Sequence, residues 1–167
     1  MIRALLMGCA LAMVGGILAG CGGSSTASAS DQTQQKDAAL YQIDQIERTW
    51  HKAASTHNVD MMMTLWAPDA VFNIGTETFT GKAQIRKFFA TENKAFMPQN
   101  HWESDTPSYK IKATVNGDKG TLYFECHYID VKTQKVASFV GVDHNVQKIN
   151  GRWLIVSSVG ATASLNP

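Results

Sequence analysis

The chain has 167 residues, of which 44% are hydrophobic and 17% charged, and its 15 Lys and Arg residues nearly balance 14 Asp and Glu residues. This balance, without a basic stripe or an acidic run, excludes nucleic acid as an expected partner and excludes a charged solvating tail. The length suits a single domain with one core, and no internal repeat divides the chain.

The first 20 residues have the layout of a secretory signal peptide. Arg3 is their only charge, and the run from Ala4 to Ala19 is apolar apart from its glycines. The run is shorter than the roughly 20 apolar residues that a transmembrane helix needs. Leu18-Ala19-Gly20-Cys21 resembles the lipobox of bacterial lipoproteins. The resemblance implies that residues 1–20 are removed and that Cys21 receives the lipid, with palmitate among its acyl chains.

A lipid on Cys21 would anchor the protein to a membrane on its extracytoplasmic side. One acyl chain gives only marginal binding, so lasting attachment needs several. By resemblance to lipoproteins of Gram-negative bacteria, Gly22 after the cysteine favours the outer membrane, facing the periplasm. Cleavage removes Cys9 and leaves Cys126 as the only thiol, which excludes an intramolecular disulfide.

Residues 21–36 are expected to form a flexible tether. After the cysteine this segment is rich in Gly, Ser, Ala and Gln and contains no large apolar side chain. Such a segment cannot bury enough surface to offset the entropy lost on ordering. The folded domain is therefore expected over residues 37–163.

Helical patterns dominate the first half of this domain. Asp37 is expected to cap a first helix, and Asn58 a second one that Pro68 ends. After a short strand at Ala70–Ile74 and a turn or small hairpin, a third helix is expected from Lys82 to Pro98. The expected inward-facing residues are Ile43, Ile46, Trp50 and Ala53 of the first helix, Met62, Leu65 and Trp66 of the second, and Ile85, Phe88, Phe89 and Phe96 of the third.

Strand patterns dominate the second half. Asn116-Gly117 and Asn150-Gly151 are signals for two-residue hairpins. Helices grouped ahead of an antiparallel sheet predict an α+β fold in which the helices cover one face of the sheet. The expected strands are Tyr109–Val115, Thr121–Val131, Val136–Ile149 and Trp153–Val159.

Three segments in order resemble the nuclear transport factor 2-like (NTF2-like) superfamily, and the SnoaL-like branch most closely. They are Asn58–Phe72, Gly81-Lys82 with Ile85, Phe88 and Phe89, and Asn150–Val156. The resemblance implies a cone-shaped barrel of the NTF2-like or cystatin-like type: three N-terminal helices packed on a strongly bent antiparallel sheet, with a cavity at the wide end. Members include isomerases, cyclases, dehydratases and non-catalytic binding modules, so the fold does not establish the function.

The ketosteroid isomerase branch is disfavoured by the residues at its functional positions. That branch places a carboxylate base where this chain has Asn73 and Ile74, and a tyrosine where this chain has Trp50. Neither Asn73 nor Ile74 can accept a proton from a carbon acid, and an indole cannot act as an acid.

Asp143 and His144 are the neighbouring residues best suited to acid–base chemistry. Neighbouring residues of a strand point to opposite faces, so only one of them can face the cavity. We expect His144 inside and Asp143 outside, because the even-numbered residues of this strand are the more apolar set. His144 could then act as a general base or be a hydrogen-bonded residue of the pocket wall. His101 resembles an active-site histidine of dehydratase relatives, but a structural role is equally compatible with its position.

The other titratable residues are expected elsewhere. His127 is predicted on the outer face of the sheet, where many relatives dimerise, and His51 and His57 on the solvated side or end of the first helix. No pair of histidines has the spacing that builds a metal site on one element. Cys126 is expected to be a small buried hydrophobe.

The leading hypothesis is a lipid-anchored SnoaL-like protein that binds a small, largely apolar molecule in its cone cavity, with catalysis left open. Two alternatives remain. The first is a cofactor-independent isomerase, cyclase or dehydratase with His144 or Asp143 as base and His101 as partner. The second is a non-catalytic envelope module that forms a homodimer through the sheet face. The residues expected to line the cavity are Trp50, Trp66, His101 and His144.

Overall fold

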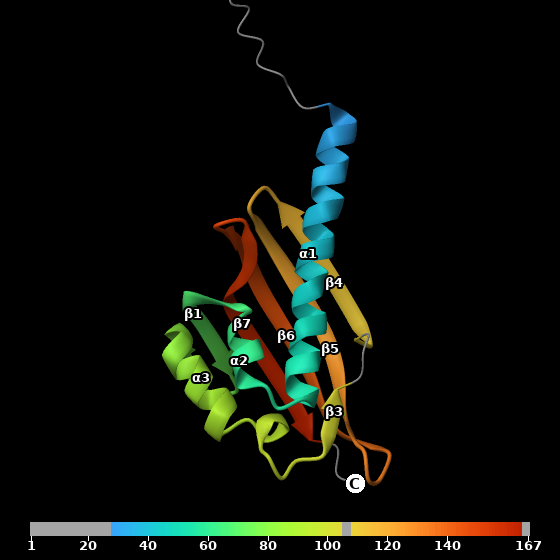
Figure 1. The fold of residues 1–167 in the computed structure, drawn as a ribbon, viewed down its shortest axis with the longest axis vertical. Helices are drawn as coiled ribbons and strands as arrows, with labels where there is room; N and C mark the ends of the chain where they lie inside the picture. Colours follow the sequence, from blue (N-terminus) through green and yellow to red (C-terminus); the bar gives the residue numbers. More distant parts are fainter. Residues whose placement is uncertain (1–27, 105–107, 165–167) are drawn as a thin grey trace, which may run out of the picture.

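The computed structural model describes residues 28–104 and 108–164, with side chains up to residue 161 (Figure 1). The predicted signal peptide, Cys21 and the tether up to residue 27 lie outside the described residues. The elements are α1 (Ala29–Ser55), α2 (Val59–Met63), β1 (Trp66–Ile74), β2 (Glu77–Thr80), α3 (Gly81–Thr91), the 3₁₀ helix η1 (Lys94–Phe96), β3 (Trp102–Ser104), β4 (Lys110–Asn116), β5 (Lys119–Asp130), β6 (Lys135–Ile149) and β7 (Arg152–Ser164).

Helix α1 begins at Ala29, eight residues before the expected cap at Asp37. Ser28 and Asp31 form a reciprocal capping box: the Ser28 hydroxyl accepts from the Asp31 backbone N–H, and the Asp31 carboxylate accepts from the Ser28 N–H. The prediction of a flexible tether is therefore wrong for residues 29–36. The lack of burial alone would favour a flexible segment, but capping and strong helix formers stabilise this end of α1 locally.

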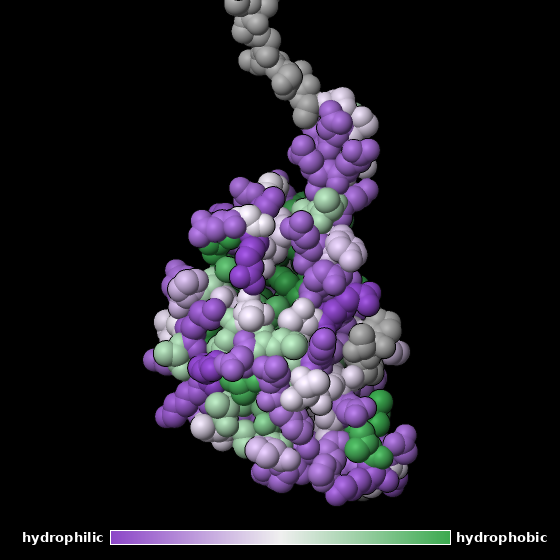
Figure 2. Space-filling view, viewed as in Figure 1, coloured by the Kyte–Doolittle hydropathy of each residue, from purple (hydrophilic) through white to green (hydrophobic). Residues whose placement is uncertain are grey.

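The N-terminal turns of α1 project beyond the sheet (Figure 1), and residues 28–38 are all exposed. Figure 2 shows a hydrophilic surface over this projecting end, which fits the absence of an apolar stripe there. None of the helices in the described ranges is long and apolar enough to cross a membrane. The expected inner face of α1 is confirmed further along, where Ile43, Ile46, Trp50 and Ala53 are buried.

Helices α2 and α3 are shorter than expected. Helix α2 ends at Met63, and Trp66 belongs to strand β1 because it pairs with Ile155 of β7. Helix α3 ends at Thr91, and a separate 3₁₀ turn follows, in which the Asn93 side chain accepts from the Ala95 N–H at 3.0 Å. Long-range pairing thus overrides a local helical pattern at Trp66.

The helices pack on one seven-stranded sheet of order β2-β1-β7-β6-β5-β3, with β4 also paired to β5. The predicted α+β architecture is confirmed, with the helices on one face of a curved sheet (Figure 1). Two details differ from the expected antiparallel barrel. The β1 and β7 strands run parallel, which makes the sheet mixed, and the sheet remains unclosed, with β2 at one edge and β3 and β4 at the other.

The two hairpin signals both lie at turns. Asn150 and Gly151 occupy the turn between β6 and β7 with φ of 49° and 78°, as a primed two-residue turn requires. The first turn is shifted by one residue, because Asn116 still pairs with Lys119 and Gly117 begins the turn.

Candidate functional site

Three of the four residues expected to line a cavity instead pack against one another in the core. The His144 ring centroid lies 5.3 Å from that of Trp50 and 6.3 Å from that of Trp66. Phe124 contacts the same imidazole with a centroid distance of 5.1 Å. Trp50 and Trp66 are 3% and 0% exposed. This aromatic cluster fills the space between α1 and the inner face of the sheet.

His101 lies away from this cluster, on the exposed segment before β3. Its backbone carbonyl accepts a hydrogen bond from Val131 at 3.1 Å, and its side chain lies in a shallow hollow with Trp102 and Asp130. The expectation that His101 and His144 share one cavity is therefore wrong. The two residues lie apart because β3, which follows His101, pairs with the end of β5, whereas His144 pairs with Leu122 near its start.

The predicted orientation of the Asp143–His144 pair is confirmed. His144 is 2% exposed and inside, while Asp143 is exposed on the other face. Neither imidazole nitrogen has a hydrogen-bond partner among the described residues. Burial lowers the pKa of His144 to about 3, so its ring is neutral at ordinary pH. A group with such a pKa is a weak general base.

An open pocket of about 520 Å³ lies beyond the aromatic cluster, where β3 and η1 contribute to its lining. We call it the end pocket. Its lining residues are Ile74, Gly75, Thr76 and Glu77 from β1, β2 and their turn, Phe88, Glu92, Asn93, Lys94 and Ala95 from α3 to η1, Trp102 from β3, Tyr128 from β5, and Ser138 and Val140 from β6.

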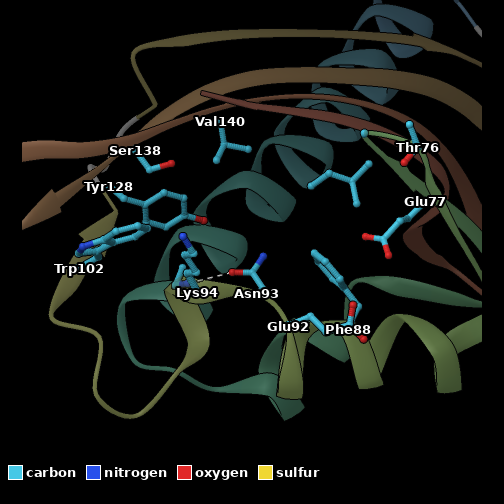
Figure 3. Close-up of a pocket in the computed structure, with 13 residues that line it drawn as sticks. Thr76, Glu77, Phe88, Glu92, Asn93, Lys94, Trp102, Tyr128, Ser138 and Val140 are labelled. Carbon is cyan, nitrogen blue, oxygen red and sulfur yellow. Dashed lines mark hydrogen bonds between the residues drawn. The ribbon is translucent and has the colours of Figure 1, made fainter. Parts of the chain in front are cut away.

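Local structure explains how these side chains converge. Gly75 has a φ of 59° in the turn that brings Glu77 back over the pocket. The end of α3 and the Asn93-capped turn of η1 place Lys94 opposite the strands. Figure 3 shows Trp102, Tyr128 and Lys94 together at one side, with Glu77 and Phe88 at the other.

The wall of the end pocket is mixed in polarity. Phe88 and Val140 provide buried apolar surface, while Tyr128 and Ser138 are buried residues with hydroxyl groups. Glu77, Glu92 and Lys94 are exposed, and no ion pair within the described ranges involves them. A concave site that combines apolar surface with polar groups able to fix a ligand's orientation suits a small molecule.

A second polar cluster lies under α1 and corrects the prediction for His51. This residue is fully buried, with its Nδ1 2.9 Å from Oε1 of Glu47 and its Nε2 3.4 Å from Oγ of Ser108. Ser108 donates to the same Glu47 oxygen from its hydroxyl at 2.6 Å and from its backbone N–H at 2.9 Å. His57, by contrast, is half-buried in the turn after α1.

Electrostatics in this cluster favour a charged carboxylate. Burial raises the pKa of Glu47, but the hydrogen bonds from His51 and Ser108 outweigh burial and bring the pKa below its usual value. Because the serine hydroxyl donates directly to the carboxylate, the arrangement ties the segment before β4 to α1. The serine proton is directed at Glu47 at 2.6 Å and not at Nε2 of His51, which lies 3.4 Å from the same hydroxyl.

The outer face of the sheet carries His127, as predicted. Its ring stacks on Tyr109 at 5.3 Å between centroids and lies 5.7 Å from Phe139. Nearby, the Tyr123 hydroxyl donates to Glu125, and this hydrogen bond, with a smaller effect of burial, raises the pKa of Tyr123 to about 12.

Metal ligands are not gathered at any of these places. Within residues 28–104 and 108–164, no three His, Cys, Asp or Glu side chains lie close enough to hold an ion. Cys126 is buried on the inner face of β5, as expected.

A family model described as SnoaL-like domain matches residues 47–154, which is most of the chain. The chain belongs to the SnoaL-like family. Its match begins within α1 and ends within β7, so it spans both the aromatic cluster and the end pocket. No curated protein matches the chain in sequence.

Solved structures described as cystatin-like or NTF2-like resemble this one at low sequence identity. A cystatin-like protein of unknown function from Nostoc punctiforme has a TM-score of 0.65 at 17% identity, over 84% of this chain and 96% of its own. An NTF2-like protein from Novosphingobium aromaticivorans has a TM-score of 0.67 at 14% identity, over 81% and 90%. A proposed dehydratase of the NTF2-like family from Streptomyces avermitilis has 0.60 at 12%, over 77% and 99%. These likenesses establish the fold alone.

Sequence reasoning missed the end pocket although a signal for it exists. Tyr128 and Ser138 lie on the inward-facing sets of β5 and β6, paired with each other in the sheet. A hydroxyl at the end of an otherwise apolar strand face is a sign that the face opens towards water there. Lys94 carried no comparable signal, because its position depends on where α3 ends.

Proposed function

We propose that this SnoaL-like protein binds a small, largely apolar molecule in the end pocket. The observation that carries the proposal is a hollow of about 520 Å³ in which buried apolar surface of Phe88 and Val140 lies beside polar groups that can orient a ligand. This relocates the binding site from the residues expected at first, since Trp50, Trp66 and His144 fill the core and His101 lies outside.

A fluorescence titration tests the proposal. N-phenyl-1-naphthylamine is a neutral probe whose emission rises in apolar surroundings. Val140→Phe fills the pocket and should weaken probe binding about tenfold or more, because each tenfold loss needs only about 1.4 kcal/mol. Val136→Phe, on the same strand but outside the pocket lining, is the matched control. Saturable binding that Val140→Phe leaves unchanged would place the probe elsewhere and contradict the proposal.

We also propose that the protein is a lipoprotein held at the extracytoplasmic side of a membrane through Cys21. The support is the leader and lipobox-like sequence, together with a helical, solvent-exposed start of α1 that would extend the attachment. Radiolabelled palmitate should enter the wild-type protein and Cys9→Ser but not Cys21→Ser. Labelling that persists in Cys21→Ser would refute the anchor.

A second function, homodimer formation through the outer sheet face, is favoured by one observation. Tyr109 is 65% exposed and stacks on His127 beside Phe139, and the Val159 side chain is also exposed. Analytical ultracentrifugation should show a dimer that Tyr109→Glu weakens. A wild-type monomer at every concentration would exclude this function.

The enzymatic alternative has weaker support. His144 is enclosed by aromatic rings and Asp143 points to the opposite face of the sheet. A cofactor-independent isomerase, cyclase or dehydratase would need a base that reaches the end pocket, and the carboxylates that line it, Glu77 and Glu92, are both exposed and are not the residues expected for that role.

A further inference from the structure

The end pocket has two electrostatically different sides. Lys94 lies at one side, near the hydroxyl-bearing Tyr128 and Ser138 (Figure 3). Glu77 lies at the other side, and Glu92 at the end of α3 adds a second carboxylate to the lining. Val140 lies between the two sides, and Phe88 provides apolar surface on the side of Glu77. A ligand in this pocket therefore contacts an apolar wall and also experiences an electrostatic field between the positive side at Lys94 and the negative side at Glu77.

Lys94 is the cation in this lining, and its position is set by the backbone. It is the first residue of η1, and the Asn93 side chain caps that turn through the Ala95 N–H. No carboxylate lies within ion-pairing distance of its amine among the described residues. An ammonium group that no protein carboxylate engages can bind a ligand anion without breaking an existing ion pair.

Neighbouring hydroxyl groups fit the same ligand chemistry. Tyr128 and Ser138 are 4% and 6% exposed and pair across β5 and β6, so their positions are held by the sheet. A hydroxyl can donate to an anionic oxygen, and hydrogen bonds to a charged group are stronger than those between neutral groups. Glu77 and Glu92 would repel the same anion from the opposite side.

We propose that the end pocket selects amphipathic molecules with an apolar body and a single anionic group, such as an organic carboxylate or sulfonate. The anionic group meets Lys94 beside Tyr128 and Ser138, and the apolar body lies against Phe88 and Val140. This inference rests on the proposed binding function and adds the charge and orientation of the ligand.

Two dyes with one aromatic scaffold test the selection. N-phenyl-1-naphthylamine is neutral, and 8-anilinonaphthalene-1-sulfonate carries one sulfonate on the same ring system. Lys94→Gln should weaken binding of the sulfonate dye about tenfold, equivalent to about 1.4 kcal/mol, because it removes the positive partner of the sulfonate, and should change binding of the neutral dye less than about twofold. Lys94→Arg should retain sulfonate binding. Lys87→Gln, an exposed lysine of α3 outside the pocket lining, is the matched control.

The carboxylate side gives the opposite result in the same assay. Glu77→Gln should strengthen binding of the sulfonate dye, because it removes a repelling charge, and added salt should reduce the difference. If Lys94→Gln weakens binding of both dyes equally, Lys94 only lines the pocket and does not select an anion, which would overturn the inference. The inference would also be overturned if this substitution changed the binding of neither dye.

Failure of the inference and failure of the proposed function are distinguishable. If the neutral dye binds and Val140→Phe blocks it, while Lys94→Gln and Glu77→Gln have no effect, the proposed binding function is supported and anion selection is refuted. If Val140→Phe blocks neither dye, the end pocket is not their site and both proposals fall. Circular dichroism of each variant verifies that it is folded.

Discussion

The aromatic cluster and the end pocket lie on the same inner face of one sheet, yet one is solid and the other hollow. His144 and Val140 are four residues apart on β6 and point to the same side. Opposite His144, α1 supplies Trp50, and the sheet supplies Trp66 and Phe124. Opposite Val140, α3 has reached its end and the small side chain of Ala95 faces the space.

The inner face is closed where large side chains of α1 and the strands meet over it, as at Trp50 and His144. Bulky rings that interdigitate leave few voids in the core. A space remains over the sheet where the covering helix ends. The cavity of this SnoaL-like protein is therefore defined by helix length and by residue size, and each can be changed separately.

The largest expected effect is on the closed side. Trp66→Ala should lower the free energy of unfolding by about 3–5 kcal/mol, because it removes a fully buried indole and leaves a cavity. Trp102→Ala, at the half-buried wall of the end pocket, should cost less than half of that and instead weaken binding of N-phenyl-1-naphthylamine. Urea denaturation and dye titration of both variants would measure this difference. Equal costs in stability would contradict the distinction between core and pocket.

A pH titration sharpens the same distinction. Because burial lowers the pKa of His144 from 6.5 to about 3, the unfolded chain binds a proton below pH 6.5 that the folded chain does not. Stability should therefore fall as pH decreases from 6.5, by up to about 1.4 kcal/mol per pH unit. Urea denaturation between pH 7.5 and 4.5 measures the slope. His144→Phe should flatten it, and an unchanged slope would show that this histidine is not its source.

The polar cluster under α1 should have a smaller effect. Ser108→Ala removes the hydroxyl donor to Glu47 and should cost roughly 1.5 kcal/mol, within the range for hydrogen bonds to charged groups. Because the contacts from Ser108 help to lower the pKa of Glu47, the loss should be present above the ordinary pKa of that carboxyl and shrink as pH falls through its folded value. Denaturation at pH 7 and at pH 3.5 separates these conditions. A cost that is equal at both would contradict the hydrogen bond as its cause.

The smallest effect on global stability is expected at the projecting end of α1. Ser28→Ala removes the capping hydroxyl, and the first turns should fray because residues 28–38 are all exposed. Hydrogen exchange should become faster over residues 29–36, while the free energy of global unfolding changes by less than about 0.5 kcal/mol. Slow exchange in the variant would mean that propensity alone holds this segment helical.

Local patterns in the chain were sufficient for much of the architecture. The spacing of Ile43, Ile46 and Trp50 predicted the inner face of α1, and alternation along β6 predicted that His144 faces inward and Asp143 outward. Gly151 marked the last hairpin. These features follow from the periods of helices and strands and from the few residues that accept positive φ, so they can be recognised from neighbouring residues alone.

Other features required contacts between distant segments. Trp66 has helical spacing but lies in a strand because Ile155 pairs with it, and β1 runs parallel to β7 without a turn that would specify the direction. His51 is buried because Ser108, 57 residues away, meets it and Glu47. The end pocket exists because α3 stops at Thr91 and places Lys94 opposite Tyr128 and Ser138. Short-range periodicity thus orients each side chain within its own element, whereas pairing and packing between elements determine which faces close and which remain open.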